Sequence, residues 1–241
     1  FNENFRLLYR DFDLVEEQEE EGEKIEPKFF LPIIPTVLLN GGSGIAVGFA
    51  TNILNRHPED LINACLDVLN GKPCPSIQPW IRGFTGAFQR VPDAPKSWTI
   101  HGKFHVKNTT TVEITEIPPS FTYEKYETYL ESLIQKGTLV SYDDHSAETP
   151  HYVLKFRRAV LAPLVKRNRL VKILKMQERV GEIYTTLDES GALRIFESPE
   201  GIVEYFVDFR LKYYRARKKN TIKRLEKELS VAAFRRRFIE E

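Results

Sequence analysis

The sequence predicts an α+β protein in which a mixed or antiparallel β-sheet with helices is followed by one long coiled-coil-forming helix. Three observations carry this prediction. Helical apolar spacing occurs on both sides of the chain's middle, strand-like alternation is concentrated between residues 99 and 156, and apolar residues recur at spacings of three and four beyond residue 199.

The composition is that of a globular protein whose charge is segregated along the chain. Of the 241 residues, 41% are hydrophobic and 29% charged, and no apolar run approaches the roughly 18 residues of a membrane span. The net charge is −6 over residues 1–28, +8 over 151–179 and +7 over 205–241. Such basic blocks suit a polyanion, although a solvated face or a coiled-coil flank is the alternative.

The first 28 residues are predicted to be a helix end and a linker. Phe5, Leu8 and Tyr9 share one helical face within residues 1–12, whereas the run VEEQEEEGEKIEPK is acidic and low in complexity. We expect this run to be exposed.

A helix is predicted in RHPEDLINACLDVLNGK, residues 56–72. Pro58 suits its first turn, and Asn70-Gly71 suits its end. Its apolar face is predicted to be Leu61, Ile62, Cys65, Leu66 and Leu69. Cys65 is therefore expected in the core and not as a nucleophile, and two cysteines in all indicate a reducing, cytoplasmic compartment.

The middle of the chain predicts a hairpin, a helix and two further strands. The hairpin is formed by residues 99–106 and 110–117, and the helix spans 123–137 with Gly137 at its end. Strands follow at TLVSY and HYVLKF.

The last third predicts a basic helix over residues 160–176, a hairpin around DESGA, and a long helix over 199–241. The long helix has a seam of Ile202, Phe206, Phe209, Tyr213 and Ala216, which resumes after a phase shift at Ile222, Leu225, Leu229 and Ala232. We expect this seam to pair with a helix outside the chain.

No set of residues predicts a catalytic or metal site in this chain. Asp143-Asp144-His145 is predicted to be a polar turn, because consecutive residues rarely converge on one ion. His101 and His105 are predicted on one face of a single strand, without a third ligand.

The segment NGGSGIAVGFATNI, residues 40–53, has the glycines of a phosphate-binding loop. A dinucleotide loop also needs a strand before it and an acid at the end of the next strand. Pro32 and Pro35 disfavour that first strand, and the nearest acids, Glu59 and Asp60, open a helix. A nucleotide-dependent oxidoreductase is therefore the weakest alternative.

The longer segment FFLPIIPTVLLNGGSGIAVGFATNI, residues 29–53, resembles the cleavage subunit of type IIA DNA topoisomerases, which is typified by gyrase A. The stretches at residues 113–137 and 206–229 resemble the family's tower domain and the start of its coiled coil. The sequence of the middle region resembles most that of the medium subunit of the T-even phage enzymes. By this resemblance, residues 1–28 are the end of a winged-helix domain with an acidic linker, 29–198 a tower-like domain, and 199–241 a truncated first coiled-coil helix.

The resemblance implies that the chemistry lies outside this fragment. The DNA-cleaving tyrosine is expected upstream of Phe1, so Tyr9 is not the nucleophile and the fragment alone is expected to be inactive. Neither a metal site nor a cofactor is expected here, because Mg²⁺ and ATP belong to other domains or subunits. Expected partners are duplex DNA, a second copy joined through a missing C-gate, and the ATPase and metal-binding subunit, in the cytoplasm (of the host cell, if the gene is from a phage) and not at a membrane.

The resemblance also assigns a DNA-binding segment. Ile45 occupies the position of the family's residue that wedges between base pairs of the gate DNA; from the residues alone, a core position was the favoured alternative. The predicted DNA-binding residues are Asn40, Gly42, Ser43, Gly44 and Ile45, together with Lys166, Arg167 and Arg169 of the basic helix. Small neighbours let backbone approach DNA, and an apolar wedge bends it. The main alternative is a non-enzymatic architectural or scaffold module that binds DNA.

Overall fold

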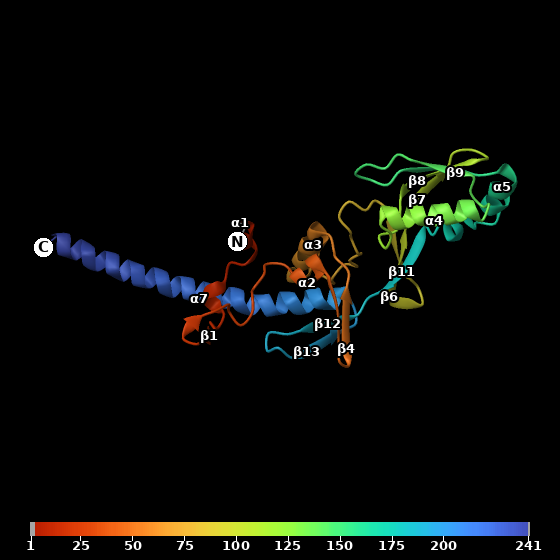
Figure 1. The fold of residues 1–241 in the computed structure, drawn as a ribbon. Helices are drawn as coiled ribbons and strands as arrows, with labels where there is room; N and C mark the ends of the chain where they lie inside the picture. Colours follow the sequence, from red (N-terminus) through yellow and green to blue (C-terminus); the bar gives the residue numbers. More distant parts are fainter. Residues whose placement is uncertain (1–2, 241) are drawn as a thin grey trace. The chain divides into compact units, whose positions relative to one another are not determined.

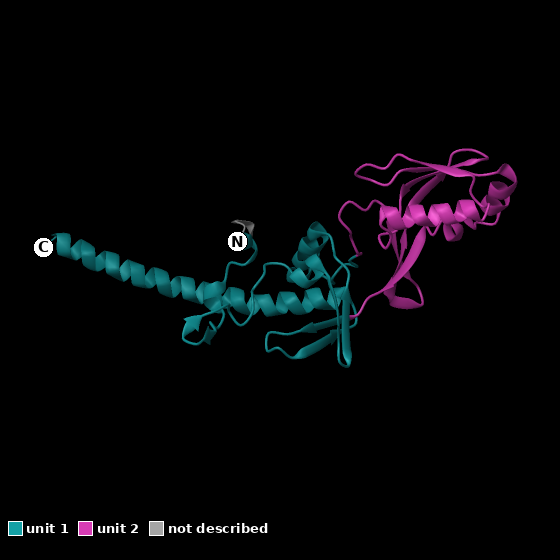
Figure 2. Ribbon diagram, viewed as in Figure 1, with its two compact units in different colours: residues 1–77, 184–241 teal, residues 78–183 magenta. Residues whose placement is uncertain are grey.

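The computed structural model describes residues 3–240, and the chain divides into two compact units (Figure 2). Unit 1 combines residues 1–77 with 184–241, and unit 2 is the continuous segment 78–183. Both are mixed helix and strand, which confirms the α+β class. The division at residues 28 and 198, which follows from the resemblance, stays a prediction.

Unit 1 begins with short elements. Helix α1 (Glu3–Leu8) is followed by the 3-10 helix η1 (Phe12–Leu14), so the predicted helix ends earlier than residue 12. The acidic run is exposed, as predicted, apart from the buried Val15 and the half-buried Pro27, and it also forms a small hairpin of β1 (Glu19–Glu20) and β2 (Glu23–Lys24). Glu21 and Gly22 both have positive φ there, which is the backbone of a tight two-residue turn.

The centre of unit 1 alternates helix and hairpin. Helix α2 (Thr36–Asn40) leads into the antiparallel strands β3 (Gly42–Ala46) and β4 (Phe49–Ile53), and then into helix α3 (Pro58–Leu69). Helix α3 confirms the prediction, with Pro58 at its first position. Its buried side is narrower than predicted, because Ile62, Leu66 and Leu69 are exposed.

Unit 1 ends with the predicted hairpin, β12 (Tyr184–Leu187) and β13 (Leu193–Phe196), and with the long helix α7 (Pro199–Glu240) (Figure 1). Its core joins elements from both segments of the unit: Leu38, Ile53, Leu61, Ala64, Cys65, Ile77, Tyr184, Ile202, Val203 and Val207. On α7 the buried side is thus centred on Val203 and Val207, while Phe206 and Phe209 of the predicted seam are only half-buried.

A buried ion-pair cluster ties η1 to α7. The Asp11 carboxylate accepts a 2.8 Å hydrogen bond from Arg210 and further bonds from Arg217, and the side chain of Asp11 is 3% exposed. Burial alone would raise the pKa of Asp11, but the two guanidinium groups outweigh burial and lower it. The cluster is therefore charged at neutral pH.

Unit 2 contains two antiparallel sheets. The first sheet has the order β11-β6-β5, and its strands are β5 (Ala87–Val91), β6 (Ala94–His101) and β11 (Gln177–Gly181). The second sheet has the order β7-β8-β10-β9, and its strands are β7 (Lys103–Val106), β8 (Thr111–Glu116), β9 (Ser141–Asp144) and β10 (Tyr152–Lys155).

Gly102 separates the two sheets, so the single strand predicted over residues 99–106 is wrong. A Cβ at Gly102 would lie 2.5 Å from the Glu116 carbonyl oxygen, and only glycine permits the chain to cross there. As a result His101 ends β6 and His105 lies in β7, and the prediction that they share one strand face is also wrong.

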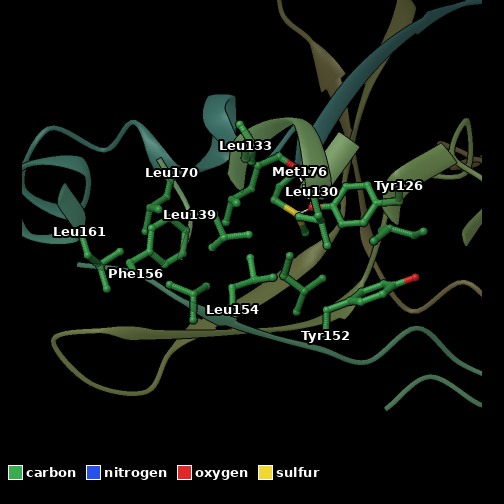
Figure 3. Packing of buried hydrophobic residues seen from close by; sticks show 14 residues of the cluster. Tyr126, Leu130, Leu133, Leu139, Tyr152, Leu154, Phe156, Leu161, Leu170 and Met176 are labelled. Atoms are coloured by element: carbon green, nitrogen blue, oxygen red, sulfur yellow. Dashed lines mark hydrogen bonds between the residues drawn. The ribbon is translucent and has the colours of Figure 1, made fainter. Parts of the chain in front are cut away.

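Three helices cover unit 2's second sheet. Helix α4 (Tyr123–Gln135) confirms the prediction; its N-cap Thr122 accepts a hydrogen bond from the Lys125 amide. The predicted basic helix is instead two helices, α5 (Arg158–Lys166) and α6 (Leu170–Ile173), because the chain turns at Asn168 with a φ of 50°. Figure 3 shows the core beneath them, where Tyr126 and Leu130 of α4 meet Tyr152 and Leu154 of β10.

Candidate nucleic-acid interface

The glycine-rich segment forms a β-hairpin and not a loop. Strands β3 and β4 pair in register from Gly42–Ile53 to Ala46–Phe49, which leaves Val47 and Gly48 as a two-residue turn. Gly48 has a φ of 83°, as the third residue of a type II turn requires. The hairpin therefore presents a short, well-defined tip.

Gly41 holds the base of this hairpin. Its φ of 63° and ψ of −172° belong to a region that is essentially restricted to glycine. A Cβ there would lie 2.6 Å from the Ile53 carbonyl oxygen and 2.7 Å from Oδ1 of Asn55. The folded chain itself thus requires glycine at this position.

Ile45 projects from the hairpin without packing. Its side chain is 94% exposed, and the residue opposite it is the small Ala50. Ser43 lies two residues away on the same face, opposite Asn52. Val47 in the turn is also fully exposed, at 101%. The alternative interpretation of Ile45 as a core residue is therefore wrong.

The other predicted residues of this segment surround Ile45 on the surface. Asn40 is the last residue of α2, and Gly42, Ser43 and Gly44 are the first three of β3; all four are exposed. A Cβ at Gly42 would meet nothing within 4 Å, and one at Gly44 only a Thr51 methyl group at 3.9 Å. Internal packing therefore does not explain these two glycines, and they leave the backbone open to an outside partner.

The face of the hairpin opposite Ile45 borders an apolar cavity of about 450 Å³ within unit 1. Gly42, Thr51 and Ile53 line one side of it, and aromatic side chains line the rest, including Phe29, Phe196, Tyr205, Phe206 and Phe209. Strand β4 also lies against β12 (Figure 1). Strand β12 thus supports one face of the hairpin, and Ile45 projects from the other.

A buried arginine anchors the chain beyond the hairpin, and sequence reasoning missed it. Arg56 is fully buried, donates from Nη1 to the Leu54 carbonyl at 2.7 Å and from Nε to the Ile77 carbonyl at 3.2 Å. Its own amide donates to Leu38 at 2.8 Å. The only feature of the sequence that pointed to Arg56 was its position between a strand and a helix that begins with proline.

The basic residues Lys166, Arg167 and Arg169 lie elsewhere, in unit 2. Lys166 ends α5, and Arg167 and Arg169 flank the turn at Asn168. All three are exposed. The structure thus places four predicted residues on one hairpin, with Asn40 at the end of the helix before it, and three on a separate surface turn, and it assigns no common site to the two groups.

The geometry does not support nucleotide binding or metal chemistry. The glycines lie in an antiparallel hairpin and not between a parallel strand and a helix. Within residues 3–240, no three His, Cys, Asp or Glu side chains are grouped so that they could hold a metal ion. Asp143 and Asp144 belong to β9, which corrects the predicted turn, and burial raises the pKa of Cys65 to about 11, as expected of a core thiol.

Comparison with known proteins identifies a family. The model of the family formed by the A subunits of DNA gyrase and topoisomerase IV matches residues 5–240. DNA topoisomerase 2 of Arabidopsis thaliana is 31% identical over 242 residues, which cover 97% of this chain and 16% of the plant protein. The DNA topoisomerase medium subunit of Enterobacteria phage T4 is also 31% identical, over 99% of this chain and 54% of the phage protein.

A solved structure has the same fold. The crystal structure of the DNA-binding, cleavage and re-ligation domain of Plasmodium falciparum topoisomerase II matches with a TM-score of 0.83 and 28% identity, over 92% of this chain and 31% of that one. The chain therefore spans only part of the length of these relatives. Within the described residues, none of the helices is both long and apolar enough to cross a membrane.

Proposed function

The chain belongs to the family of the DNA gyrase and topoisomerase IV A subunits, and on this premise we propose that it is a DNA-gate-binding part of a type II DNA topoisomerase. Its role is to bind and bend the duplex that the whole enzyme cleaves and passes another duplex through. The observation that carries this proposal is Ile45, an isoleucine that is 94% exposed on a supported hairpin.

An unpacked apolar side chain at this place has a physical use. Inserting it between base pairs removes its surface from water, at roughly 25 cal/mol per Å². Unstacking one base step costs on the order of a few kcal/mol, and the resulting bend brings more DNA backbone against protein. Packing of β4 against β12 supports the hairpin from its other face, and a wedge needs such support.

The neighbours of Ile45 suit contact with phosphates. The Ser43 hydroxyl and the side-chain amide of Asn40 can donate hydrogen bonds to phosphate oxygens, which position a protein on DNA without reading its sequence. Gly42 and Gly44 lie on the other face of β3 from Ile45, and their lack of a side chain keeps the strand thin where its backbone comes close to DNA. Lys166, Arg167 and Arg169 are proposed to contact the flanking duplex, because they are exposed and basic.

We assign the cleavage chemistry to other parts of the enzyme. The ring of Tyr9 packs against those of Phe5 and Phe30, with centroid distances of 4.6 Å and 5.6 Å. These contacts indicate that Tyr9 has a packing role. We propose, from the family resemblance, that Mg²⁺ is held by another domain or subunit. The proposed partners are a second copy of the chain and the subunit or domain that carries the metal and ATP sites, in the cytoplasm, or in that of the host cell if the gene is from a phage.

The wedge is tested by Ile45→Ala in the full-length protein. Energy transfer between dyes at the two ends of a duplex reports the bend, and we expect the variant to bind with a clearly smaller bend. Ile195→Ala is the matched control, because Ile195 is also an exposed isoleucine on a hairpin of unit 1, at 61%. An unchanged bend in a folded Ile45→Ala protein would show that Ile45 is not the wedge.

A further inference from the structure

Helix α7 carries a row of basic side chains that the hairpin's function does not use. Lys212, Arg215, Lys219, Lys223 and Lys227 follow one another at spacings of three, four, four and four residues. At about 3.6 residues per turn, these spacings place them on one side of the helix, over roughly 22 Å of its length. We call these five residues the basic stripe.

The charges of the basic stripe are free. All five residues are exposed, and no ion pair within residues 3–240 involves them. Some basic residues outside the stripe are paired: Arg224 with Glu228, and Arg236 with Glu240. One acid, Glu226, lies on the same side of the helix as the stripe, so this face keeps a net charge of about +4 at neutral pH.

The stripe is also separate from the apolar seam of the same helix. Ile222, Leu225 and Leu229 are 46%, 52% and 72% exposed. The centre of this seam lies roughly 100° around the helix from the centre of the stripe, at about 100° per residue, and Ile222 borders the stripe beside Arg215. A helix that paired with the seam would therefore leave most of the basic stripe open to solvent.

We propose that the basic stripe of α7 binds the phosphates of duplex DNA, at a place distinct from the wedge hairpin and without reading sequence. A row of evenly spaced cations with no apolar residue larger than Ala216 on its face suits a regular polyanion better than a folded protein surface. Duplex DNA carries about one charge per 1.7 Å of its axis, so roughly 22 Å of duplex offers more phosphates than the stripe has cations. This inference rests on the proposed function only in that DNA is the ligand.

The test is the salt dependence of duplex binding by the full-length protein. Each phosphate contact contributes about 0.9 to the slope of log K against log salt concentration. The double variant Lys219→Gln/Lys223→Gln should make that slope shallower by about 1.8. The matched control is Lys218→Gln/Arg235→Gln, which removes the same charge from exposed positions of α7 outside the stripe and should change the slope by much less.

The two possible failures are distinguishable. Equal slopes in the two double variants, or no change in the stripe variant with intact helicity by circular dichroism, would overturn the stripe as a DNA contact. The bend measured by energy transfer should remain normal in the stripe variant, because Ile45 is untouched. Conversely, a failure of Ile45→Ala to reduce the bend leaves the slope measurement fully interpretable.

Discussion

At the scale of single residues, the two neighbouring glycines at the hairpin's base have different reasons to be glycine. Gly41 adopts a backbone conformation closed to other residues, with carbonyl and amide oxygens where a Cβ would lie. Gly42 has ordinary φ and open space around it. The fold therefore requires glycine at position 41, whereas contact with a partner is the explanation that remains for glycine at position 42.

This difference gives a paired prediction. Gly41→Ala should lower the free energy of unfolding by at least about 2 kcal/mol, because strain at such a φ and ψ is added to two contacts that are too short. Gly42→Ala should change it by less than about 0.5 kcal/mol, yet weaken duplex binding. Urea unfolding and a binding titration measure both; a destabilised Gly42→Ala or an unaffected Gly41→Ala would contradict the geometry.

The buried Asp11 makes stability depend on pH. Its pKa is lowered in the folded state, because the hydrogen bonds from Arg217 and Arg210 outweigh burial. A carboxyl group with a lowered pKa stabilises the fold fully above its unfolded pKa of about 3.9, and this contribution is lost as the pH falls through the folded pKa.

We therefore expect Asp11→Asn to cost about 3 kcal/mol at pH 7, since it leaves buried guanidinium charge unpaired. The difference from the parent protein should begin to shrink below about pH 4, where Asp11 of the unfolded chain becomes protonated, and should be lost as the pH falls through the lowered pKa of folded Asp11. Asp13→Asn is the control, because Asp13 is exposed on the same 3-10 helix. Urea unfolding at pH 7 and pH 3 measures both; a cost independent of pH would mean that the charge of Asp11 is not what stabilises the fold.

At the scale of elements, the sequence predicted best where period and end signals agree. Helices α3 and α4 have strong helical spacing, a proline or threonine at the start and a glycine beyond the end. Strands β5 and β11 were missed, because pairing with β6 and not their own alternation defines them. The glycine at position 102 indicated that the strand predicted over residues 99–106 is interrupted. The predicted basic helix is divided at Asn168, although its residue types alone suggest one continuous helix.

The hairpin that carries Ile45 is a further element that its own sequence does not predict. Strand β3 contains two glycines and an alanine where β-branched residues favour a strand, so local preference predicts a loop. Pairing with β4 and support from β12 override that preference. The exposure of Ile45 could not be inferred from composition, because an isolated isoleucine is usually packed; only the resemblance to the topoisomerase family pointed to it.

At the scale of the whole molecule, the two units differ in how the chain builds them. Unit 2 is one continuous segment, residues 78–183, with its own buried cluster of fourteen hydrophobic side chains. Unit 1 needs two segments that are far apart in sequence, and its core joins Leu61 of α3 with Val203 of α7. A continuous segment of about 100 residues with one core is of a size that folds alone.

We predict that residues 78–183, expressed by themselves, unfold cooperatively in urea, with a near-UV circular dichroism signal from packed tyrosines such as Tyr126 and Tyr152. Leu130→Ala should destabilise this isolated unit by about 3 kcal/mol, as truncation of a fully buried leucine does. In the whole chain, Leu130→Ala should shift only the transition of unit 2, while Leu61→Ala, an equally buried leucine of unit 1, should shift only the other. A single transition that both variants move equally, or a non-cooperative isolated segment, would show that unit 2 depends on unit 1 to fold.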